Sequence, residues 1–212
     1  MTISNDSRAR VKRIFEPIAL GLGRLGLTPD ALTLIGFGIT VVGAALLAAQ
    51  LWLVGGIVVL LGGAFDMFDG TLARATGKVS RLGAFMDSVF DRWGEAIVYL
   101  GIVWGGVLIG SHLVPILGAA AMGVAFMVSY TRAKSEGLGF TEATGMAAVG
   151  VMPREVRLVI LSLGLIAAGA VGNITILSAA LAIIATGATI TVIQRILHVR
   201  SQARSAGPTS TL

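Results

Sequence analysis

The residues best suited to chemistry in this chain are four aspartates that occur in two closely spaced pairs, Asp66 with Asp69 and Asp87 with Asp91. Side chains three or four positions apart lie on the same face of an α-helix, so each pair presents two carboxylates to one side. Carboxylate oxygens are hard ligands that suit Mg²⁺, Mn²⁺ or Ca²⁺. If the helices that carry the two pairs are neighbours, the spacing predicts a single site where four carboxylates bind divalent cations.

Both pairs lie in strongly apolar sequence, where a charged side chain costs roughly 2.5–3.5 kcal/mol on insertion scales. Converging carboxylates would also repel one another unless a cation neutralised them. One alternative needs no metal: the aspartates could form a structural ion network with the nearby arginines Arg74, Arg81 and Arg92. Gly70, Ala73 and Gly83 favour a ligand site instead, because small residues on the carboxylate face leave room for a ligand to approach the backbone.

The composition identifies the chain as an integral membrane protein. Of its 212 residues, 55% are hydrophobic and only 13% are charged, whereas a soluble domain has about 25% charged residues. The absence of cysteine excludes a disulfide framework and a cysteine-based metal or redox site. Apolar segments of about 20 residues can cross a bilayer, and they predict an all-α fold with six transmembrane helices, at 31–49, 52–73, 82–109, 113–133, 156–171 and 174–196.

The basic residues predict how these helices are oriented. All 16 Lys and Arg residues lie in the N-terminal segment, around the second–third connection, in or beside the fourth–fifth connection, or at the C-terminal end. By the positive-inside rule, this side faces the cytoplasm, and so do both termini. The net charge of +5 is therefore interpreted as a topology signal, and we expect no nucleic-acid partner.

Three segments are expected along the chain. Residues 1–30 mix apolar with basic side chains, which predicts an amphipathic juxtamembrane helix on the membrane surface, with a solvated basic tail as the alternative. Residues 31–198 form the six-helix domain, and residues 199–212 form a polar C-terminal tail. The first long apolar run starts only near Ala31, so we expect no cleaved leader.

The aspartates and small residues together form one extended motif, Asp66-x2-Asp69-Gly70-x2-Ala73-Arg74-x8-Gly83-x3-Asp87-x3-Asp91. It resembles the signature of the CDP-alcohol phosphotransferase (phosphatidyltransferase) family, with every motif position occupied at the family's spacing. The resemblance covers nearly the whole chain, since that family also has six helices, an amphipathic N-terminal helix and cytoplasmic termini.

The resemblance implies an enzyme of phospholipid biosynthesis, which transfers a phosphatidyl group from CDP-diacylglycerol to an acceptor hydroxyl and releases CMP. It implies two divalent cations, Mg²⁺ or Mn²⁺, bound by Asp66, Asp69, Asp87 and Asp91, with Asp91 also acting as the general base. The CDP-binding residues would be Asp30, Thr33, Asp66, Asp69, Gly70, Ala73, Arg74 and Gly83. It further implies a multi-pass cell-membrane protein with its active site facing the cytoplasm, and a homodimer.

Asp30 also has a purely structural explanation. Thr28 and Pro29 are typical of the cap and first position of a helix, and Asp30 would then lie in its first turn.

Basic residues at membrane depth bear on the identity of the acceptor. Arg154 and Arg157 share a helix face, and Arg195 lies on an otherwise apolar helix, so several cations could gather around an acceptor that carries its own phosphate. These segments are similar to the phosphatidylinositol phosphate synthases of actinobacteria, although those usually read Arg-Pro-Glu-Arg where this chain reads Arg154-Glu155-Val156-Arg157. The similarity implies that inositol 1-phosphate is the acceptor and that its phosphate is bound by Ser129, Arg132, Lys134, Arg154, Arg157 and Arg195.

Two alternatives stay open for this region. Glycerol 3-phosphate is the other phosphorylated acceptor, and the arginines could simply extend to the membrane surface from helix ends.

A different class of protein, a small divalent-cation transporter, would use the aspartates as a transit site but would need polar residues along the rest of the pore. The non-cytoplasmic halves of the six segments are apolar, which favours an enzyme.

Overall fold

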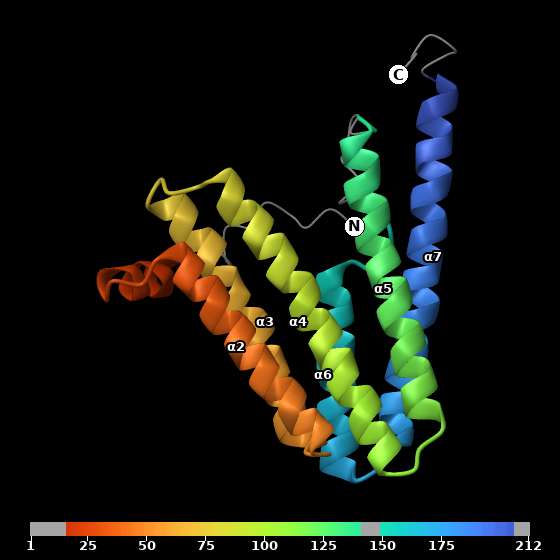
Figure 1. Cartoon of the computed structure of the whole chain (residues 1–212). Coiled ribbons are helices and arrows are strands. Elements are labelled where there is room, and N and C mark those ends of the chain that lie inside the picture. The colour runs from red at the N-terminus through yellow and green to blue at the C-terminus, as the bar shows by residue number, and fades with distance from the viewer. Residues whose placement is uncertain (1–15, 141–148, 206–212) are drawn as a thin grey trace.

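The computed structural model describes residues 16–140 and 149–205, and all secondary structure in these ranges is helical. A helix over residues 16–24 precedes six long helices (Figure 1). These are α2 (Pro29–Ala48), α3 (Trp52–Ala75), α4 (Arg81–Leu108), α5 (Leu113–Gly137), α6 (Arg154–Val171) and α7 (Thr175–Ser205).

The six helices coincide with the six predicted apolar segments to within a few residues, except that α7 continues beyond residue 196 to Ser205. Residues 199–205 of the predicted polar tail are therefore helical. Within the predicted juxtamembrane segment, residues 16–24 are helical and run at a steep angle to α2 (Figure 1). Residues 1–15 of that segment and the end of the tail lie outside the described residues.

Two of the helices that form the site, α2 and α4, begin at well-formed caps. The hydroxyl of Thr28 accepts a hydrogen bond from the Ala31 N–H at 3.2 Å, and Pro29 occupies the first position of α2. Ser80 caps α4 in the same way, since its hydroxyl accepts from the Gly83 N–H at 2.9 Å. Such caps satisfy backbone donors that have no partner within the helix.

Four of the described helices, α2, α3, α5 and α7, are long and apolar enough to cross a membrane. The other two fall short because of charge. The last 18 residues of α4 contain Asp91, Arg92 and Glu95, and the 18 residues of α6 contain Arg154, Glu155 and Arg157. These are the same charged residues that build the site described below.

The helices form two groups that meet at one end of the bundle and diverge at the other (Figure 1). α2 packs against α3 and α4, α5 packs against α7, and α6 contacts both α3 and α7. Fully buried side chains such as Leu47, Tyr99, Ile102, Leu165 and Leu181 form the main core. The core joins the two groups, and the site lies where they diverge.

Candidate active site

The first pocket, of about 250 Å³, is formed by the start of α2, the end of α3 and the start of α4. A Cβ on Gly83 would lie 3.0 Å from the Ser80 hydroxyl and 3.7 Å from Asp30 Oδ1, so a larger side chain would fill it. We call it the glycine-lined pocket. Its walls include seven of the eight residues expected to bind CDP, namely Asp30, Thr33, Asp69, Gly70, Ala73, Arg74 and Gly83.

Two polar residues of this pocket, Lys78 and Ser80, were not predicted from the sequence. Lys78 adds a second cation beside Arg74, on the short connection between α3 and α4. The position of Lys78 in the sequence could have indicated this role, because a lysine between two carboxylate-bearing helices lies close to any anion bound there.

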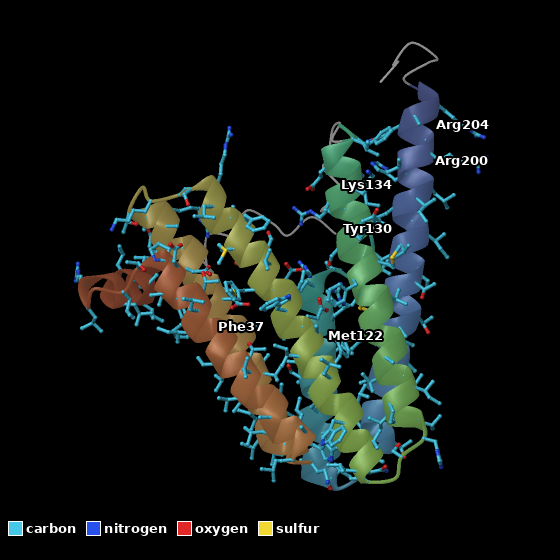
Figure 2. The ribbon with its side chains drawn as sticks, in the orientation of Figure 1. Phe37, Met122, Tyr130, Lys134, Arg200 and Arg204 are labelled. Carbon is cyan, nitrogen blue, oxygen red and sulfur yellow. The ribbon has the colours of Figure 1, made fainter. Side chains whose placement is uncertain are left out.

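The second pocket, of about 640 Å³, lies among α4, α5, α6 and α7. We call it the arginine-lined pocket. Lys134 does not line this pocket. Its side chain is exposed and lies further along α5, toward the same end of the bundle as Arg200 and Arg204 of α7 (Figure 2). The other five residues expected to bind the acceptor phosphate all line it: Ser129, Arg132, Arg154, Arg157 and Arg195.

The predicted metal ligands lie where the two pockets meet. Asp87 lines both pockets, Asp69 lines the glycine-lined pocket, and Asp91 lines the arginine-lined pocket. Asp66 lines a smaller cavity that also includes Arg154. Two ligands bound in the two pockets would therefore approach each other at the aspartates.

The aspartates make specific contacts in this arrangement. Asp69, only 5% exposed, accepts hydrogen bonds from the Thr33 hydroxyl at 2.6 Å and from the Gly70 N–H. Arg154 bridges α3 and α4: its Nη2 lies 2.9 Å from Asp66 Oδ2 on α3, and its Nη1 lies 2.8 Å from Asp91 Oδ1 on α4. An arginine does pair with the aspartates, as the metal-free alternative supposed, but it comes from α6.

No group of three or more His, Cys, Asp or Glu side chains is arranged to hold a metal ion within residues 16–140 and 149–205. The expected convergence of four carboxylates on one point is thus not present in this arrangement. The donor set nevertheless suits a hard divalent cation, because Asp66 and Asp87 each interact electrostatically with the other three aspartates. The guanidinium of Arg154 already places positive charge between two of them.

Glu95, one turn beyond Asp91, has a role that sequence reasoning missed. Its Oε1 accepts from Arg157 Nε and its Oε2 from Arg157 Nη2, both at 2.9 Å. Arg157 is 1% exposed and also donates to the Met152 carbonyl at 3.1 Å. Arg92 adds a further bond to Glu95 at 3.2 Å. Glu95 therefore links the first turn of α6 to α4 through hydrogen bonds.

Arg195 is also held by the protein itself. Its Nε donates to the Val149 carbonyl at 3.0 Å, and its Nη1 donates to the Val128 carbonyl of α5. Only the remaining N–H groups of Arg195 are free to face a ligand, since a guanidinium has five donors.

Two relatives are similar in sequence to this chain over most of its length. The chain is 35% identical over 199 residues to a phosphatidylinositol phosphate synthase of Mycobacteroides abscessus, covering 92% of this chain and 87% of that protein. It is 37% identical over 155 residues to an archaetidylinositol phosphate synthase of Pyrococcus horikoshii, covering 73% and 77%.

Solved structures of the Mycobacterium tuberculosis phosphatidylinositol phosphate synthase are also similar. The structure with CDP-DAG bound gives a TM-score of 0.79 at 31% identity, covering 88% of this chain and 94% of that one. The structure in complex with manganese and citrate gives 0.77 at 30% identity, covering 88% and 89%.

The family comparison matches the same region that forms the two pockets. The sequence model of CDP-alcohol phosphatidyltransferases matches residues 26–211, which include all six long helices and every residue of the motif. The chain therefore belongs to the CDP-alcohol phosphatidyltransferase family.

Proposed function

We propose that this protein transfers the phosphatidyl group of CDP-diacylglycerol to a hydroxyl of inositol 1-phosphate and releases CMP. The observation that carries the proposal is the position of Asp87 in the walls of both pockets. A nucleotide in the glycine-lined pocket and a phosphorylated acceptor in the arginine-lined pocket would meet at the aspartates.

The choice of acceptor rests on charge and on the relatives. Four arginines among the five predicted residues of the arginine-lined pocket suit an acceptor that bears a phosphate, and disfavour serine or choline. The two relatives described above are named for different lipids, phosphatidyl and archaetidyl, but both names contain inositol phosphate. That shared part of the names supports inositol 1-phosphate over glycerol 3-phosphate.

The residues of the site have separate tasks in the proposed reaction. Asp91 lines the arginine-lined pocket, where its carboxylate can take the proton of the acceptor hydroxyl. The acceptor oxygen then bonds to the phosphorus of the phosphatidyl group as the bond to CMP breaks. Two divalent cations, Mg²⁺ or Mn²⁺, held by Asp66, Asp69, Asp87 and Asp91 would polarise the pyrophosphate and neutralise charge on the departing CMP.

The pocket walls supply positioning. Arg74 and Lys78 attract the anionic pyrophosphate, while Gly70 and Gly83 leave space for the nucleotide. Holding both reactants at one point removes much of the entropic cost of bringing them together.

We further propose that all six long helices cross the membrane, with both termini and the site at the cytoplasmic side. The one-sided distribution of Lys and Arg supports this orientation. The lipid tails would then stay in the bilayer while the nucleotide reaches water. The functional unit is proposed to be a homodimer, as the family resemblance implies.

The test is CMP release by the purified protein in detergent micelles with CDP-diacylglycerol, measured in parallel with inositol 1-phosphate, glycerol 3-phosphate, free inositol and serine. We expect release only with Mg²⁺ or Mn²⁺, and fastest with inositol 1-phosphate. Faster release with glycerol 3-phosphate would refute the acceptor assignment. Release that continues in excess EDTA would refute the role of the metal.

A further inference from the structure

We propose that Arg154 is an exchangeable cation: it neutralises Asp66 and Asp91 in the metal-free protein, and divalent cations displace it into the arginine-lined pocket. There it becomes available to the phosphate of the acceptor. This inference rests on the proposed function for the nature of the metal and the acceptor. It predicts that metal and acceptor bind cooperatively.

The geometry at Arg154 places one guanidinium between two helices. Separate nitrogens contact Asp66 Oδ2 on α3 at 2.9 Å and Asp91 Oδ1 on α4 at 2.8 Å. Arg154 is the first residue of α6, its side chain is 27% exposed, and it lines the arginine-lined pocket. It therefore lies at the boundary between the carboxylates and the open pocket.

Metal binding and the Arg154 contacts compete for the same carboxylates. A divalent cation takes its ligands directly from carboxylate oxygens, and one oxygen each of Asp66 and Asp91 is bonded to Arg154. A guanidinium close to a bound divalent cation would also repel it. Because the cation carries twice the charge of Arg154, it compensates the four aspartates more fully.

The surroundings restrict where Arg154 can go. The bonds between Glu95 and Arg157 fix the first turn of α6, so only the side chain of Arg154 is free to move. Arg157 and Arg195 point donors at fixed protein acceptors. Arg154 instead contacts two carboxylates that a divalent cation can also bind. Its guanidinium can therefore leave them and contact the phosphate of the acceptor.

Thermodynamic linkage turns this exchange into a measurable quantity. If metal binding frees Arg154 for the acceptor, then the acceptor must raise metal affinity by the same factor. Couplings of this kind typically change affinity about 5–150-fold. Removing Arg154 should abolish the coupling and, because a competitor is lost, strengthen metal binding in the absence of acceptor.

The experiment measures Mn²⁺ binding to the full-length protein in detergent micelles, without CDP-diacylglycerol, from the electron paramagnetic resonance signal of free Mn²⁺. Titrations are run with and without inositol 1-phosphate for the wild type, Arg154→Gln and Arg92→Gln. Arg92 is the matched control because it lines the same pocket and interacts electrostatically with Asp87 and Asp91, but is bonded to Glu95. General electrostatics would affect both variants alike.

We expect Arg154→Gln to bind Mn²⁺ roughly tenfold more tightly than the wild type without acceptor, and more tightly than Arg92→Gln. We also expect inositol 1-phosphate to raise the Mn²⁺ affinity of the wild type but not of Arg154→Gln. Unchanged or weaker Mn²⁺ binding by Arg154→Gln, or an equal gain in Arg92→Gln, overturns the exchange. Persistent coupling in Arg154→Gln overturns the transfer of Arg154 to the acceptor.

If Arg154→Gln does not fold, Arg154→Lys replaces it. A lysine cannot contact two carboxylates through separate nitrogens, so we expect a smaller gain in Mn²⁺ affinity, and no gain overturns the exchange. The titration without acceptor needs no turnover and no particular acceptor. Failure of the proposed function is therefore seen separately, as absence of CMP release by the wild type.

Discussion

The buried pair of Glu95 and Arg157 makes a strong prediction about stability. Arg157 is 1% exposed and Glu95 11% exposed, and two hydrogen bonds of 2.9 Å join them. Replacing Glu95 with alanine leaves a buried guanidinium without its carboxylate. Removing one partner of a buried pair costs about 3–5 kcal/mol. At about 2–4 °C per kcal/mol for a chain of this size, the melting temperature should fall by about 6–20 °C.

The chain offers a matched control in Glu136, which pairs with Arg132 at 2.9 Å while both side chains are 40% exposed or more. An exposed pair is worth about 0–1 kcal/mol, so Glu136→Ala should barely change the melting temperature. The assay is thermal unfolding in detergent micelles, followed by far-ultraviolet circular dichroism. The double variant Glu95→Met/Arg157→Met should recover much of the loss, because the buried guanidinium is removed together with its carboxylate, and Arg92, which also loses Glu95, is 29% exposed. Equal melting temperatures for Glu95→Ala and Glu136→Ala would refute this reasoning.

Three further substitutions probe the site itself. Gly36→Ala would place a Cβ 2.7 Å from Asp66 Oδ1, so it should weaken Mn²⁺ binding measured by electron paramagnetic resonance. Gly38→Ala is the control, because its Cβ would meet nothing within 4 Å, and it should leave Mn²⁺ binding unchanged. Equal Mn²⁺ affinities for the two variants would contradict the placement of Asp66. Gly83→Leu should fill the glycine-lined pocket and raise the KM for CDP-diacylglycerol more than it lowers kcat in a CMP-release assay, and an unchanged KM would exclude this pocket as the nucleotide site. Arg195→Ala should raise the KM for inositol 1-phosphate and also lower the melting temperature, since the Val128 and Val149 carbonyls each lose one donor. An unchanged KM would remove Arg195 from the acceptor site.

Local sequence patterns predicted the helices well, and the family resemblance indicated which residues line the glycine-lined pocket. Apolar segments separated by turns and caps set the bounds of α2 to α6, because each helix must bury or embed its own apolar length. Seven of eight predicted nucleotide-pocket residues line one cavity. Five of them belong to the motif on α3 and α4, which a short connection joins, and Asp30 and Thr33 come from the start of α2, which packs against both helices. Neighbours along the chain thus become neighbours in space.

Contacts between distant segments could not be predicted in the same way. Arg154 reaches Asp66 across 88 positions, and Arg157 reaches Glu95 across 62, so no spacing rule connects them. The similarity to phosphatidylinositol phosphate synthases grouped Lys134 with the arginines, but Lys134 is exposed on α5 and does not line the arginine-lined pocket. Which acidic groups a cation contacts depends on how the helices pack, and the residue pattern within one segment does not determine that packing.

The most direct test of the central claim is to identify the lipid product. Wild-type protein and Asp91→Asn are incubated side by side with CDP-diacylglycerol, inositol 1-phosphate and Mn²⁺, and the lipids are analysed by mass spectrometry. We predict that the wild type forms phosphatidylinositol phosphate in equal amount to the CMP released, while Asp91→Asn keeps its helical circular dichroism spectrum and forms none. Product formation at the wild-type rate by Asp91→Asn, or CMP release by the wild type without the inositol lipid, would contradict the account.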